Sequence, residues 1–82
     1  MNFKFCGEYV IMDILPVGDK GAAMGINQTN GSFATWEIAG GEYKEPHYFT
    51  DIDEATEDLC LRTLRELRLK KQLQKTEKER RR

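Results

Sequence analysis

The strongest constraint on the fold of this chain is a run of apolar residues at helical spacing in its C-terminal part. Between Ile52 and Leu67, apolar or small residues recur every three or four positions, which predicts an α-helix with one side suited to cover a sheet. Lys70 and Lys71 occupy the positions that would continue this stripe, so packing is expected to end near Leu67. The stripe comprises Ile52, Ala55, Thr56, Leu59, Cys60, Thr63, Leu64 and Leu67.

Polar residues mark the start of this helix. Thr50 or Asp51 is placed to accept hydrogen bonds from the free amides of the first turn. Acids crowd the start of the helix, where the helix dipole favours negative charge: Asp53, Glu54, Glu57 and Asp58. The central Gly and distal Glu of a calcium-binding loop are absent, so these acids need no ion to explain them. No metal site is predicted.

The first fifty residues carry the pattern of short strands. Phe3 to Leu15 is rich in aromatic and branched residues, Gly7 interrupts its alternation, and Pro16 closes it. A later turn at residues 40–41 leaves His47–Phe49 as an edge strand or as a lead-in to the helix. We therefore expect an α+β fold, in which a small antiparallel sheet of three to four strands is covered by one long C-terminal helix.

Asn30-Gly31 separates two strand-like runs and is the strongest local signal for a hairpin. If these two residues alone form the turn, Gly25 lies opposite Trp36 and places a small residue under the indole. Trp36 would then share one face of the sheet with the residues two positions before and after it. The intervening residues would face the other way.

A chain of 82 residues has room for one hydrophobic core. We expect a single α+β domain over residues 1–67 and a basic helical extension or frayed tail over residues 68–82. No apolar run approaches the roughly 20 residues of a membrane-spanning helix, and the first residues lack the pattern of a secretory signal peptide. These features predict a cytoplasmic protein without a membrane partner.

The net charge of −1 conceals a division of charge along the chain. Residues 1–58 contain three basic and eleven acidic residues, a net charge of −8. Residues 59–82 contain ten basic and three acidic residues, a net charge of +7. Such asymmetry indicates a charged partner. It would also suit a homodimer in which the acidic part of one chain meets the basic part of another.

Few residues in the chain are suited to catalysis. His47 is the single histidine, and neither Cys6 nor Cys60 has a second cysteine at metal-ligand spacing. An enzyme hypothesis would depend on Cys6 or His47. The cysteines are expected to be reduced core thiols, although a Cys6–Cys60 disulfide is conceivable if the helix covers the first strand. We predict a protein that is not an enzyme and has no cofactor.

The acidic part predicts binding to a basic protein. Surface carboxylates can take the place of phosphates in a nucleic-acid channel, and opposite charges speed the encounter. An acidic surface that only aids solubility explains the same residues equally well. The predicted contact residues are Glu8, Asp13, Glu37, Glu42, Glu45, Asp53, Glu54 and Glu57.

The basic part predicts the alternative, which is DNA or RNA binding. Clusters of Lys and Arg supply most non-specific affinity for nucleic acid by releasing counterions, although a solvated helix also explains them. Leu69 and Leu73 form a small second apolar patch, either a dimer or partner contact or ordinary surface leucines. The predicted nucleic-acid or partner contacts follow one side of the helix: Arg62, Arg65, Arg68, Lys71, Lys75 and Lys78.

Residues Asn30–Trp36 predict strand structure, and Tyr48–Ala55 lead into the helix. This compact plan resembles the small accessory proteins of bacterial mobile elements and phages, some of which are anti-CRISPR inhibitors. The resemblance implies a short, acidic, single-domain protein that binds a larger nucleic-acid-handling protein and inhibits or modulates it by occlusion. The basic tail departs from a pure nucleic-acid mimic.

Overall fold

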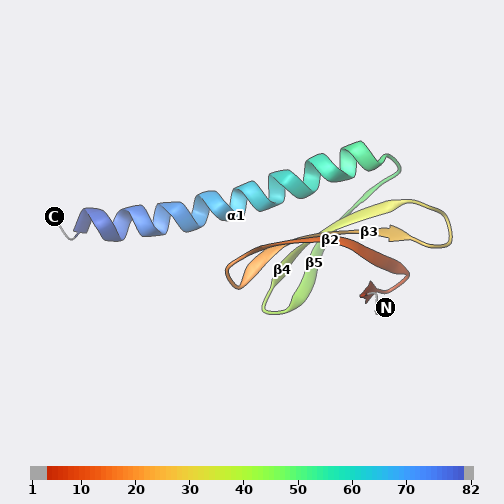
Figure 1. Ribbon diagram of the computed structural model, residues 1–82, viewed down its shortest axis with the longest axis horizontal. Coiled ribbons are helices and arrows are strands. Elements are labelled where there is room, and N and C mark those ends of the chain that lie inside the picture. The colour runs from red at the N-terminus through yellow and green to blue at the C-terminus, as the bar shows by residue number, and fades with distance from the viewer. Residues whose placement is uncertain (1–3, 81–82) are drawn as a thin grey trace.

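The computed structural model describes residues 4–80 of the chain and the side chains of residues 4–72. Five strands form one antiparallel sheet in the order of the chain, and a single helix lies over one face of it (Figure 1). The α+β class is therefore confirmed, but three to four strands was an underestimate. The elements are β1 (Phe5–Cys6), β2 (Tyr9–Val17), β3 (Lys20–Asn27), β4 (Phe33–Ala39), β5 (Glu42–Phe49) and α1 (Ile52–Arg80).

The additional strands arise at the two edges of the sheet. Gly7 takes a φ of 60° and turns the chain between β1 and β2, so the run that begins the sequence is two strands rather than one. Pro16 does not end β2, because β1 pairs only with Tyr9 and Val10, and the side of β2 without a partner strand at Pro16 tolerates a residue without an amide hydrogen. β5 was partly missed because it is polar, and the side chains of an edge strand can face water.

The β3–β4 hairpin is confirmed, but its turn is longer than two residues. Oδ1 of Asn27 accepts hydrogen bonds from the amides of Thr29 at 2.8 Å and Asn30 at 3.2 Å. The amide of Asn27 donates to the carbonyl oxygen of Ser32 at 2.7 Å, which closes a loop over residues 28–31. The asparagine side chain thus replaces the expected two-residue turn.

The longer loop shifts the pairing of β3 with β4 by two residues. Ala23, rather than Gly25, lies opposite Trp36. Gly25 still lies against the indole, because a Cβ atom at Gly25 would approach the Trp36 ring to 3.1 Å and the carbonyl oxygen of Val10 to 2.8 Å. The expectation of a small residue beside the indole is confirmed, and so is the placement of Ala34 on the same face as Trp36.

Each face of the sheet carries an apolar cluster. The cluster under α1 consists of Ala22, Met24, Ala55 and Leu59, with Phe33 and Phe49 packed against it. The cluster on the other face surrounds Trp36, and the curled sheet brings the rings of Tyr9 and Tyr48 to 6.2 Å between centroids. Tyr9 also meets Trp36 edge to face at 5.4 Å, a favourable arrangement of aromatic rings. The curl thus buries the tryptophan without a second helix.

Helix α1 begins where it was predicted to begin. Oδ1 of Asp51 accepts a hydrogen bond from the amide of Asp53 at 3.1 Å, which makes Asp51 the N-cap residue. The carbonyl oxygen of Asp51 also accepts the amide of Ala55 at 3.1 Å, the first bond of the helical ladder. The capping choice between Thr50 and Asp51 is therefore resolved in favour of Asp51.

The face of α1 that meets the sheet differs from the predicted stripe. Ala55 and Leu59 are buried as expected, but the next buried residues are Arg62 and Glu66. Thr63 is half-buried, and the other predicted stripe residues are exposed: Ile52, Thr56, Cys60, Leu64 and Leu67. The helix is therefore rotated about its axis relative to the predicted orientation.

Among the described side chains of α1, the last buried one is Glu66, one residue before the predicted limit of packing at Leu67. Leu69 and Lys70 line a shallow groove together with the turn from Val17 to Lys20. From there α1 continues to Arg80 and projects past the sheet (Figure 1). Within residues 4–80, no helix is both long and apolar enough to cross a bilayer.

Candidate interaction surfaces and the Asp58 network

A dense cluster of polar side chains lies between α1 and the sheet, around Asp58. Its Oδ2 atom accepts hydrogen bonds from Oγ1 of Thr35 on β4, from Nδ1 of His47 on β5 at 3.0 Å and from Nε of Arg62 on α1 at 3.0 Å. Nη2 of Arg62 also donates to the carbonyl oxygen of Glu45 at 2.5 Å. This Asp58 network therefore joins the helix to the last two strands.

These hydrogen bonds keep Asp58 in its charged form. Burial by itself would raise the pKa of Asp58, but hydrogen bonds from Thr35, Arg62 and His47, together with the charge of Arg62, lower the pKa below its ordinary value. Thr35 is fully buried, and Arg62 is 6% exposed. A carboxylate that stays ionised and already accepts three hydrogen bonds is suited to anchoring the fold rather than to donating a proton.

The Asp58 network changes the roles of two predicted contact residues. Arg62 cannot serve as a nucleic-acid contact, because its guanidinium is buried and bonded within the fold. Glu45 takes a φ of 51° and presents its backbone carbonyl to Arg62. The i, i+4 spacing of Asp58 and Arg62 was the one signal of this network in the sequence. Nothing local indicated that Thr35 and His47 would join it.

Cys6 and His47 lie on opposite faces of the sheet. Cys6 packs beside the Trp36 cluster, whereas His47 bonds to Asp58 on the face under α1. Cys60 is exposed on α1 and both cysteines are free, so the conceivable disulfide is not formed and Cys60 is not a core thiol. Among the side chains that the structure describes, no group of three or more His, Cys, Asp or Glu residues is placed to hold a metal ion.

Three of the predicted acidic contacts, Glu8, Asp53 and Glu54, lie at the end of the sheet where α1 begins, and so does Asp51, which was not among them. The strand pairing places the start of β2 and the end of β5 at the same end of the sheet (Figure 1). Four exposed carboxylates lie at this end, and none forms an ion pair with a described side chain. We call them the acidic end: Glu8, Asp51, Asp53 and Glu54.

The other predicted acidic contacts do not belong to the acidic end. Glu42 lies at the opposite end of the sheet and pairs with Lys44 at 3.7 Å. The antiparallel pairing of the strands distributes the remaining five acidic residues over other parts of the sheet and helix. They are Asp13 in β2, Glu37 in β4, Glu42 and Glu45 in β5, and Glu57 on α1.

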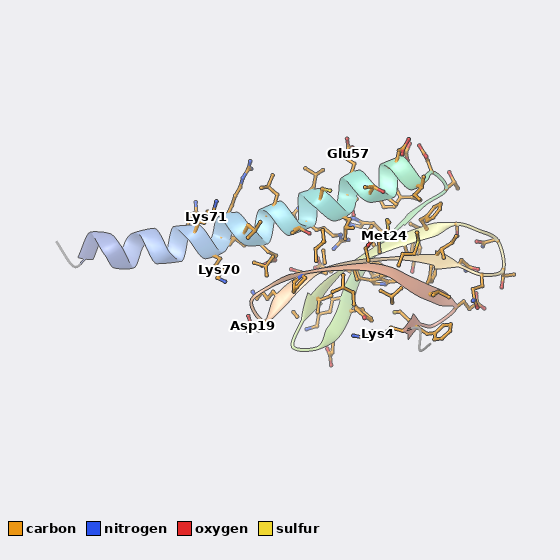
Figure 2. The ribbon with its side chains drawn as sticks, viewed as in Figure 1. Lys4, Asp19, Met24, Glu57, Lys70 and Lys71 are labelled. Carbon is orange, nitrogen blue, oxygen red and sulfur yellow. The ribbon has the colours of Figure 1, made fainter. Side chains whose placement is uncertain are left out.

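Three of the predicted basic contacts are exposed on α1. Arg65, Arg68 and Lys71 form no ion pair with another side chain in the described part of the chain. Figure 2 draws Lys71 on the side of α1 away from the sheet, whereas Lys70 lies on the sheet side. Lys75 and Lys78 are on the same helix, but their side chains are outside the described residues.

The predicted patch of Leu69 and Leu73 is only partly described. Leu69 is exposed beside the turn that joins β2 to β3, and the side chain of Leu73 lies outside the described residues. A larger apolar strip lies on the side of α1 away from the sheet. We call it the outer face: Cys60, Leu61, Leu64 and Leu67.

Comparison of the chain with protein-family models, with curated proteins and with solved structures gave no match. The case for a function therefore depends on the surfaces described above.

Proposed function

We propose that this protein is a non-enzymatic interaction protein that acts in the cytoplasm and binds a larger nucleic-acid-handling protein through its acidic end. The observation that carries the proposal is the group of four exposed carboxylates without a cationic partner among the described side chains. Their potential would attract a basic groove that normally holds nucleic acid. Binding there would inhibit or modulate the partner by occlusion, as anti-CRISPR accessory proteins of mobile elements do.

The Asp58 network supports this proposal because it would hold the acidic end rigid. Asp51, Asp53 and Glu54 lie in and before the first turn of α1, and Asp58 fixes the next turn to β4 and β5. A rigid surface loses less conformational entropy on binding than a flexible one. The carboxylates would thus already be in their binding arrangement before the partner is bound.

A pull-down tests the proposal. The tagged full chain is incubated at low salt with a nuclease-treated bacterial lysate, and captured proteins are identified by mass spectrometry. Neutralising Glu8→Gln, Asp53→Asn and Glu54→Gln together should abolish capture of a nucleic-acid-handling protein, while Asp51 is kept as the helix cap. The matched control removes the same charge elsewhere, with Asp13→Asn, Asp19→Asn and Glu42→Gln, and should retain capture. Equal loss in both variants would contradict the proposal.

The alternative function is DNA or RNA binding through α1. The observation that favours it is the exposure of Arg65, Arg68 and Lys71 on a helix that extends past the sheet (Figure 1). Fluorescence anisotropy with random-sequence duplex DNA at increasing salt measures this activity. Binding that is lost in an Arg65→Gln, Arg68→Gln, Lys71→Gln variant, in a protein that captures no partner, would favour the alternative over the acidic end.

A further inference from the structure

The outer face of α1 is apolar where an exposed helix surface is normally polar, although the exposed Arg68, four residues after Leu64, lies on the same side of the helix. Leu61 is 53% exposed and Leu64 is 41% exposed, and both Cys60 and Leu67 are exposed as well. Their spacing of three and four residues places them along one strip of the helix. Leu64 lies nine residues after the buried Ala55, which corresponds to the opposite side of a helix with 3.6 residues per turn.

The charges that flank this strip have opposite signs and symmetric positions. Glu57 precedes Leu64 by seven residues and Lys71 follows it by seven, so both lie about two helical turns from Leu64 and on its side of α1. Figure 2 shows Glu57 and Lys71 on the side of the helix away from the sheet. Neither forms an ion pair with a described side chain of its own chain.

We propose that a second copy of this chain docks on the outer face, with the two α1 helices antiparallel and Leu64 at the two-fold axis. In this arrangement Leu64 meets the Leu64 of the second copy, and Leu61 meets Leu67. Glu57 meets Lys71 at each end of the contact. The two-fold axis produces the Leu61–Leu67 and Glu57–Lys71 contacts twice and the Leu64 contact once, which is the common geometry of protein dimers.

Charge and geometry favour the antiparallel copy as the occupant. Parallel helices would place Glu57 against Glu57 and Lys71 against Lys71, which is repulsive at both ends. The sheet lies on the other side of α1, so two helices can meet without contact between the sheets (Figure 1). The dimer would be a layered structure of sheet, helix, helix and sheet. It does not depend on the function proposed above.

Sedimentation equilibrium of the full chain at low salt tests the apolar part of the contact. The native protein should have twice the mass of one chain, and Leu64→Glu should be monomeric with an unchanged circular dichroism spectrum, because Leu64 does not contact the sheet. Leu69→Glu is the matched control: it makes the same substitution at an exposed leucine outside the outer face, and should remain dimeric. A monomeric native chain at low salt, or loss of the dimer only in Leu69→Glu, overturns the proposal.

Charge reversal tests the orientation of the helices. Glu57→Lys alone and Lys71→Glu alone should each weaken the dimer about tenfold, because each creates two like-charge contacts. The double variant, Glu57→Lys with Lys71→Glu, should restore native affinity, since opposite charges again face each other. Single variants that dimerise as well as the native chain, or a double variant no tighter than the singles, overturn the antiparallel arrangement.

Discussion

The inner and outer faces of α1 differ in a way that hydrophobicity alone would not produce. Beyond Leu59, the inner face meets the sheet through two charged residues, Arg62 and Glu66, whereas the outer face presents Leu61 and Leu64 to water. The burial of Arg62 is stabilised by its hydrogen bonds to Asp58 and to a backbone carbonyl. A directional polar contact can therefore set the rotation of a helix and leave apolar side chains exposed on its outer side.

The largest contrast is expected between leucines on the two faces. Leu59→Ala should lower the free energy of unfolding by about 3 kcal/mol, because Leu59 is buried between α1 and the sheet and its truncation leaves a cavity. In the monomer, Leu64→Ala should change this free energy by about 0.5 kcal/mol or less, since Leu64 is exposed on the side of α1 away from the sheet. Urea unfolding of both variants at low protein concentration measures the difference. Equal losses would break the comparison.

Removing the carboxylate of the Asp58 network should have the next largest effect. Asp58→Ala leaves Arg62 without its charged partner and Thr35 without its acceptor, which should cost about 2 kcal/mol. Glu57→Gln, one residue earlier on the same helix, is the control and should have little effect in the monomer. Urea unfolding at neutral pH measures both stabilities. If Asp58→Ala is as stable as Glu57→Gln, Asp58 does not anchor the helix to the sheet.

Acid should lower the stability of the packing between α1 and the sheet, because it protonates Asp58. The pKa of Asp58 in the folded protein lies below its ordinary value of 3.8, so its stabilising effect is present above about pH 5 and is lost as the pH falls through the folded pKa. The stability difference between the native chain and Asp58→Ala should therefore shrink as the pH falls below about 4. Urea unfolding across this range tests the sign. A difference that grows in acid would contradict it.

The smallest effect is expected for the buried hydroxyl of the network. Thr35→Val keeps the shape of the side chain but removes one donor to Asp58, and should cost about 1 kcal/mol. The pKa of Asp58, followed by carboxyl NMR chemical shifts, should rise toward its ordinary value in this variant. An unchanged pKa would show that Arg62 and His47 alone keep the carboxylate ionised.

Local signals in the sequence predicted much of this fold. The cap at Asp51, the hairpin near Asn30 and the glycine turns each depend on a few neighbouring residues, and all are present. The register at Trp36 was missed because the side chain of Asn27 lengthens the loop. Such a bond depends on where a side chain points and not on residue type alone.

The candidate sites were harder to predict because they depend on contacts between distant segments. Helical spacing grouped Leu64 with Leu59, but the bonds of Arg62 to β5 and Asp58 turn Leu64 outward. Glu42 and Glu54 were both predicted as acidic contacts, but antiparallel folding carries Glu42 to the far end of the sheet from Glu54. Neither arrangement can be predicted from the spacing of residues in the sequence.

Oxidative cross-linking tests most directly the claim that the outer face of α1 is a contact surface and the inner face is not. In a chain with Cys6→Ser and Cys60→Ser, Leu64→Cys should form a covalent dimer rapidly, because the two-fold axis brings these positions together. Leu69→Cys should not. In the native chain, which keeps Cys60, this cysteine should form no cross-link, since it would lie about 12 Å along the helix from the Cys60 of the second copy. Cross-linking at position 69 but not 64, or at equal rates at both, would contradict the account.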